Sequence, residues 1–124
     1  MVPRAASEHG SPHPVGMVID DDVQIRESVA AILEDVCDYV YQASDGQEGL
    51  EVLDQHPDIT LIVTDIAMPR LDGLSFAARA RRDRPELKVL FVSGMHNPPE
   101  GEPFLAKPFR TRALMCALDG LLEG

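Results

Sequence analysis

Residues 59–65 read Ile-Thr-Leu-Ile-Val-Thr-Asp, an apolar and β-branched run of six residues followed by a carboxylate. Such a run predicts a strand that is covered on both faces, as in a parallel sheet. On either side of it, short apolar runs alternate with helical patterns along the chain. Further strands are predicted at 17–19, 39–43, 89–92 and 104–106.

Amphipathic stripes between these runs predict the helices. Apolar residues recur at helical spacing within 25–36, 50–53, 74–82 and 114–121. Asp45 and Glu48 form a capping-box pair at the start of the second helix, and His56-Pro57 ends it. Alternating strands and helices predict an α/β fold, a doubly wound parallel sheet with helices on both sides.

Composition indicates one domain with a real hydrophobic core. The chain has 124 residues, of which 44% are hydrophobic, and its formal net charge is −10. That charge disfavours direct binding to nucleic acid or anionic lipid. No apolar run approaches the ~20 residues of a membrane span, so we expect a cytoplasmic protein. Residues 1–16 lack hydrophobic periodicity and predict a disordered tail, which leaves 17–124 as the folded domain.

Polar residues follow four of the predicted strands at their carboxyl ends, where open parallel sheets bind ligands. Asp20 and Asp21 follow the first strand, Asp65 the third, Ser93 the fourth and Lys107 the fifth. Two carboxylates ~4 Å apart repel by about 4 kcal/mol at an effective dielectric of 20. A hard cation such as Mg²⁺ would relieve that repulsion, and an aspartate can serve as nucleophile toward a phosphoryl group. These strand ends therefore predict a phosphoryl-transfer site.

Short motifs around these positions resemble the receiver domains of two-component response regulators. The resemblance extends from Met17 to the end of the chain. It implies a flavodoxin-like five-stranded sheet with strand order 2-1-3-4-5. The motifs that carry it are Val18-Ile19-Asp20-Asp21, Thr64-Asp65-Ile66-Ala67-Met68-Pro69, Asp72-Gly73, Ser93-Gly94 and Lys107-Pro108-Phe109.

The resemblance also implies roles for single residues around the cation. Asp65 would accept the phosphoryl group and would also be a ligand of the cation. Asp21 would bind Mg²⁺ directly, Asp20 through water, and the Ala67 main-chain carbonyl would be a further ligand, with Mn²⁺ as a possible substitute. The protein would not be a conventional enzyme, because it would catalyse only its own phosphorylation and dephosphorylation. The donor would be a histidine kinase or a histidine phosphotransfer protein, and output would pass through an unknown partner.

Other implied roles concern the phosphoryl oxygens and the fifth strand. Ser93 and Lys107 would hold those oxygens. The Lys107–Pro108 peptide bond would be cis, which aims Lys107 into the site. Phe104 matches the aromatic switch position of the family.

The chain departs from the family between the fourth and fifth strands. Receivers normally carry a full helix there, but residues 95–103 are only nine and include three prolines. Proline costs ~3 kcal/mol inside a helix, so this segment predicts a loop and a missing fourth helix. Ser93-Gly94 and the Pro-Phe-Leu-Ala-Lys-Pro-Phe run at 103–109 resemble receivers attached to hybrid histidine kinases, so a relay or phosphate-sink role is an alternative to ordinary output. Ala67 and Met95 would flank the phosphoryl group, and because neither can orient a water molecule we expect slow phosphate loss.

Two other functions are compatible with parts of the sequence. A phosphatase resembling the haloacid dehalogenase family would use Asp20 and Asp22, which have the required spacing. However, Gln24 stands where that family has threonine or valine, and Asp22 can equally be a helix cap. The other alternative is a receiver-like interaction module that is never phosphorylated.

Overall fold

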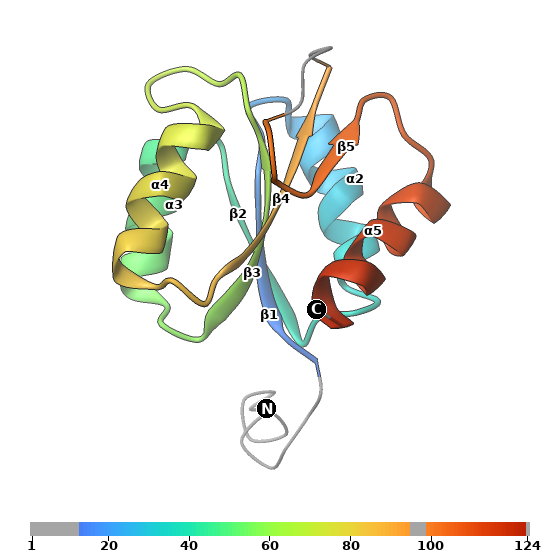
Figure 1. Ribbon diagram of the computed structural model, residues 1–124, viewed down its shortest axis with the longest axis horizontal. Helices are drawn as coiled ribbons and strands as arrows, with labels where there is room; N and C mark the ends of the chain where they lie inside the picture. Colours follow the sequence, from blue (N-terminus) through green and yellow to red (C-terminus); the bar gives the residue numbers. More distant parts are fainter. Residues whose placement is uncertain (1–12, 95–98, 124) are drawn as a thin grey trace.

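The computed structural model describes residues 13–94 and 99–123 and contains one five-stranded parallel sheet of order β2-β1-β3-β4-β5 (Figure 1). This architecture confirms the predicted fold class and strand order. The strands are β1 (Val15–Ile19), β2 (Tyr39–Ala43), β3 (Ile59–Asp65), β4 (Lys88–Ser93) and β5 (Phe104–Ala106).

Helices cover both faces of the sheet (Figure 1). One layer contains α3 (Gly46–Gln55) and α4 (Gly73–Asp83), and the other contains α2 (Val23–Leu33) and α5 (Thr111–Glu123). Among the described residues, no helix is both long enough and apolar enough to cross a membrane.

The central strand β3 supplies both hydrophobic cores. Leu61 and Val63 pack into the cluster beneath α2 and α5, whereas Ile62 packs into the cluster beneath α3 and α4. All three side chains are fully buried. Full burial of such a side chain contributes about 1.5–3 kcal/mol, so this strand stabilises both layers at once.

The first strand begins two residues earlier than the sequence predicted. Val15 and Gly16, expected in the disordered tail, belong to β1 and pair with Tyr39 and Val40. Gly16 interrupts the apolar run, but a Cβ there would lie 3.2 Å from Cys37 Sγ, so a small residue suits this packed position. The remainder of the predicted tail, apart from His13 and Pro14, lies outside the described residues.

The connection from β4 to β5 contains no helix in its described part. Residues 99–103 form turn and coil, which confirms the loop prediction for that part; 95–98 lie outside the described residues. Arg81 of α4 donates two hydrogen bonds to the Glu102 carboxylate, at 2.9 and 3.0 Å. The short connection is thereby held against α4.

The start of α3 has the predicted N-cap, but the Glu48 side chain bonds to a residue one position earlier than a capping box predicts. Asp45 Oδ1 accepts a hydrogen bond from the Glu48 N–H at 2.8 Å, as an N-cap should. Glu48, however, reaches past Asp45 and accepts bonds from the Ser44 N–H and hydroxyl, at 2.6 and 2.8 Å. The capping box thus extends one residue further toward β2.

Gly73 permits the closest backbone approach near the end of β3. A Cβ built on it would lie 2.0 Å from the main-chain oxygen of Asp65 and 3.1 Å from Ile66 Cα. Both are backbone atoms, which cannot move aside cheaply. In contrast, Gly120 in α5 has open space at its Cβ position.

We therefore expect Gly73→Ala to lower the free energy of unfolding by about 3 kcal/mol or more, because overpacking against backbone forces the β3–α4 connection apart. Gly120→Ala is the matched control and should raise it by up to about 1 kcal/mol, since alanine suits a helix interior better than glycine. Urea denaturation followed by circular dichroism measures both. Equal midpoints for the two variants would contradict the steric argument.

Candidate functional site

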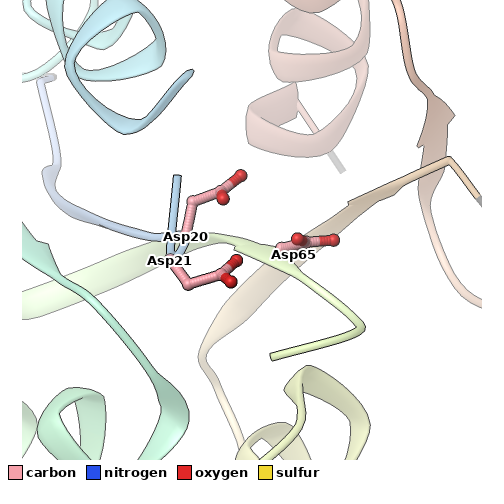
Figure 2. Close-up of side chains that lie close together, drawn as sticks. All are labelled: Asp20, Asp21 and Asp65. Carbon is pink, nitrogen blue, oxygen red and sulfur yellow. The ribbon is translucent and has the colours of Figure 1, made fainter. Parts of the chain in front are cut away.

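Three carboxylates meet at the carboxyl ends of β1 and β3 (Figure 2). Asp20 and Asp21 follow β1, and Asp65 ends β3. One oxygen from each lies within 4.8 Å of the others. Asp20 and Asp65 are buried and Asp21 is exposed, so the cluster opens to solvent on one side. The structure therefore brings together the three aspartates that the sequence predicted.

Hydrogen bonds from main-chain N–H groups fix the segment that carries the first two aspartates. The Asp20 N–H donates to the Ala43 carbonyl at 3.1 Å, and Asp20 Oδ1 accepts from the Asp22 N–H at 2.9 Å. Asp22 itself caps α2, because its carboxylate accepts from the N–H groups of Gln24 and Ile25. Its carboxylate is committed to the helix and is not part of the three-carboxylate cluster, which weakens the phosphatase hypothesis.

Lys107 lies directly after β5 and reaches across to the aspartates. Its Nζ lies 2.8 Å from Asp20 Oδ2 and 3.4 Å from Asp65 Oδ2. The Lys107–Pro108 peptide bond is cis, as the resemblance implied. The Lys107 N–H also donates to the main-chain oxygen of Ser93 at 2.9 Å, which joins the ends of β4 and β5.

The other predicted residues lie around this group. Ser93 is buried at the end of β4, and Ala67 is exposed two residues beyond Asp65, in the connection to α4. Phe104 is half-buried at the start of β5 and packs against the core beneath α3 and α4. Met95 lies outside the described residues.

Burial and charge set the protonation behaviour of the site. Burial raises the pKa of the Asp65 carboxyl; Lys107 opposes this rise, and the Asp20 charge adds to it. Burial alone would lower the pKa of Lys107, but its hydrogen bond to Asp20 and the charges of Asp20 and Asp65 raise it. Lys107 is therefore cationic at neutral pH.

One ammonium group faces three carboxylates, so the cluster carries excess negative charge. Closely spaced carboxylate oxygens with that excess are the donor set that hard divalent cations prefer. The residues present thus fit Mg²⁺, with Asp21 on the open side of the cluster.

Two arginines near the site were not singled out from the sequence. Arg26 on α2 donates to the main-chain oxygen of Asp20 at 2.9 Å and to Gln42 Oε1 at 3.2 Å. Arg70 pairs with Asp45, with Nε and Nη2 each 2.8 Å from Oδ2. Arg26 and Gln42 are 16 positions apart in the sequence, and Arg70 and Asp45 are 25 positions apart. No local sequence pattern could therefore have revealed either side-chain contact.

The raised pKa of Asp65 has a consequence for stability. The native state binds this proton more tightly than the unfolded chain, so the stabilising contribution is complete at low pH. This contribution is lost as pH rises from the unfolded-state pKa of about 3.9 through the raised native-state pKa of Asp65. We expect Asp65→Asn, at neutral pH without divalent cations, to raise the free energy of unfolding by an amount on the order of 1 kcal/mol.

Urea denaturation at several pH values tests this expectation. The gain should vanish at pH values where Asp65 is protonated in both states, and it should shrink when Mg²⁺ stabilises the wild type. Asp35→Asn, at an exposed carboxylate after α2, is the control and should change little. A less stable Asp65→Asn protein at neutral pH would contradict the argument.

The chain is similar in sequence to a known protein family and to individual proteins of known name. The family described as "Response regulator receiver domain" matches residues 17–119. The response regulator receiver protein CpdR of Brucella abortus is 32% identical over 114 residues, which cover 86% of this chain and 94% of CpdR. The sensor kinase CckA of the same organism is 28% identical, but the match covers only 12% of that protein.

Solved structures agree with these sequence matches. The crystal structure of the receiver domain from the hybrid histidine kinase CckA has a TM-score of 0.73 and 31% identity, covering 87% of this chain and 98% of that one. The CheX–CheY–BeF3–Mg²⁺ complex from Borrelia burgdorferi has a TM-score of 0.81, with 97% of each chain covered. Its identity is 21%, so that likeness concerns the fold alone.

Proposed function

The chain belongs to the response regulator receiver domains of two-component signalling, and from that premise we propose that Asp65 accepts a phosphoryl group in a Mg²⁺-dependent reaction. The observation that carries the proposal is the cluster of Asp20, Asp21 and Asp65 with Lys107 at its edge. The proposed donor is a phosphohistidine on a histidine kinase or phosphotransfer protein, and the proposed output is through a partner protein.

The chemistry assigns each residue a distinct task. An oxygen of Asp65 attacks phosphorus, a P–O bond forms, the P–N bond to the donor imidazole breaks, and the electron pair returns to the imidazole nitrogen. Asp65 is oriented for this step because its Oδ1 accepts the Ile66 N–H at 2.7 Å. Mg²⁺ would be held by Asp21, by Asp20 through water and by the Ala67 carbonyl. When bound, it would supply positive charge for the phosphoryl oxygens.

Lys107 and Ser93 complete the proposed site from the other side. The Lys107 ammonium pairs with Asp20 and Asp65 in the described structure. When a phosphoryl group adds negative charge on Asp65, that ammonium can pair with a phosphoryl oxygen instead. The Ser93 hydroxyl, buried at the end of β4, would donate a hydrogen bond to another oxygen.

The surface beside the site suits a protein donor. A hollow of about 620 Å³ lies between α2 and the segment that follows β5, and its lining includes Ile25, Ile32 and Phe109. Lys107 lines this hollow as well as the site, and the neighbouring Val23 side chain is 49% exposed. A donor protein that covers these apolar side chains would bring its phosphohistidine close to Asp65.

Phosphorylation with acetyl phosphate and Mg²⁺, followed by intact-protein mass spectrometry, tests the proposal. We expect a gain of one phosphoryl group that EDTA prevents and Asp65→Asn abolishes. Asp22→Asn is the matched control, because asparagine also caps helices and leaves the cluster intact. Retained modification in Asp65→Asn, or its loss in Asp22→Asn, would instead favour the phosphatase. If neither acetyl phosphate nor a panel of phosphorylated histidine proteins modifies the wild type, the protein is an unphosphorylated interaction module.

We also predict that the phosphoryl group is lost slowly, because the methyl group of Ala67 cannot position an attacking water. Ala67→Asn introduces an amide that can do so and should speed the loss several-fold, whereas Ala67→Val should not. The decay of phosphorylated protein after removal of the donor measures both rates. An Ala67→Asn protein that keeps its phosphate as long as the wild type would refute this explanation.

A further inference from the structure

Arg70 has a backbone conformation that side chains rarely adopt. Its φ is 68°, the one positive value among the non-glycine residues that the structure describes. A side chain in this region is crowded against its own backbone, so the conformation persists only where the surroundings enforce it. Arg70 lies three residues beyond Ala67, inside the connection between β3 and α4.

Several contacts enforce the conformation of this connection. The Leu71 carbonyl accepts the Gly46 N–H at 3.1 Å, and the Ile66 carbonyl accepts the Gly73 N–H at 2.8 Å. The Gly46–Leu71 approach is close, because a Cβ on Gly46 would lie 2.4 Å from the Leu71 oxygen. Residues 66–73 are thereby held between the end of β3 and the start of α3.

The Arg70–Asp45 pair is the side-chain part of this attachment. Asp45 is buried and simultaneously accepts the Glu48 N–H, so its carboxylate has a fixed position at the start of α3. Burial alone would raise the pKa of Asp45, but its hydrogen bonds from Glu48 and Arg70 and the Arg70 charge lower it. Arg70 thus binds an anchored carboxylate with two nitrogens, although 62% of its own side chain is exposed.

We propose that Arg70 is a positioning residue for the cation site: through Asp45 it holds the β3–α4 connection, and with it the Ala67 main-chain carbonyl, against α3. This inference rests on the proposed function, in which that carbonyl is a metal ligand. Arg70 touches neither the cation nor the phosphoryl group in this proposal. It acts by limiting the movement of the segment that follows Asp65.

An effect of Arg70 through its charge and an effect through positioning predict opposite changes in cation affinity when the side chain is removed. Removing a cationic side chain near a cation site should, by charge alone, tighten the binding of a divalent ion. Removing a positioning contact should weaken it. Residues that orient metal ligands typically contribute 10- to 100-fold to affinity, and we expect about three- to tenfold here because the pair is partly exposed.

Mn²⁺ binding, measured by the electron paramagnetic resonance signal of free ion, provides the test. Arg70→Gln and Arg70→Gly should both weaken binding by that factor, and Arg70→Lys should recover part of it. Arg82→Gln, which removes an exposed arginine near the end of α4, is the control for net charge and should leave affinity unchanged. Arg70→Gly is informative because glycine tolerates the positive φ, so affinity should fall without a parallel loss of stability.

A double-mutant cycle shows whether Arg70 acts through Asp45. Asp45→Asn retains a helix-capping side chain but loses the ion pair. The double variant Asp45→Asn/Arg70→Gln should bind Mn²⁺ no more weakly than either single variant, since the two changes break one contact. Additive losses would overturn the proposed route through Asp45.

Two outcomes separate this inference from the function on which it rests. If the wild type binds Mn²⁺ and the Arg70 variants bind it equally or more tightly, the positioning role is wrong and the proposed function stands. If the wild type binds no Mn²⁺, the proposed cation site and the positioning role fall together. Phosphorylation of Asp65 provides an independent reading of the proposed function in both cases.

Discussion

Burial of β3 on both faces is the constraint on which the rest of the structure depends. Leu61, Ile62 and Val63 have no accessible surface, so each face of the sheet requires a covering layer. Parallel neighbours then require helical crossovers, which supply those layers. The same parallel arrangement places the carboxyl ends of β1, β3 and β4 at one edge. The gathering of Asp20, Asp65 and Ser93 is thus a consequence of how the hydrophobic core is built.

That gathering carries an electrostatic cost which the core must offset. Asp20 and Asp65 are buried near one another, and burial raises the pKa of Asp65 even with Lys107 3.4 Å away. A fold optimised only for stability would place neutral side chains at these strand ends. Retaining ionisable groups there leaves a site that gains free energy when positive charge arrives. This property suits the proposed reaction, in which a cation and an incoming phosphoryl group are bound together.

The sequence predicted the features that depend on local pattern or on strand ends. The run at 59–64 identified the central strand, and Asp45 identified the start of α3, because periodicity and capping act over a few residues. Features set by distant packing were missed. Val15 belongs to β1 because it pairs with β2, and that pairing is not visible in the local sequence. Arg70 has a positive φ that only a glycine or asparagine at this position would have indicated. The contact between Arg26 and the Asp20 carbonyl likewise required the folded chain.

The shortened connection between β4 and β5 separates reception from output in physical terms. The residues of the proposed phosphoryl-transfer site lie at strand ends whose positions follow from the sheet, so a shortened connection elsewhere leaves them in place. Two hydrogen-bonded contacts hold the described part of the connection. Arg81 of α4 donates to Glu102, and the Phe91 N–H of β4 donates to the Pro103 carbonyl. A change at Ser93 would therefore pass toward a short segment whose described part, 99–103, forms turn and coil and is tied to α4. The surface that responds to phosphorylation would then comprise α4, this segment and β5, and an output partner would have to recognise that combination.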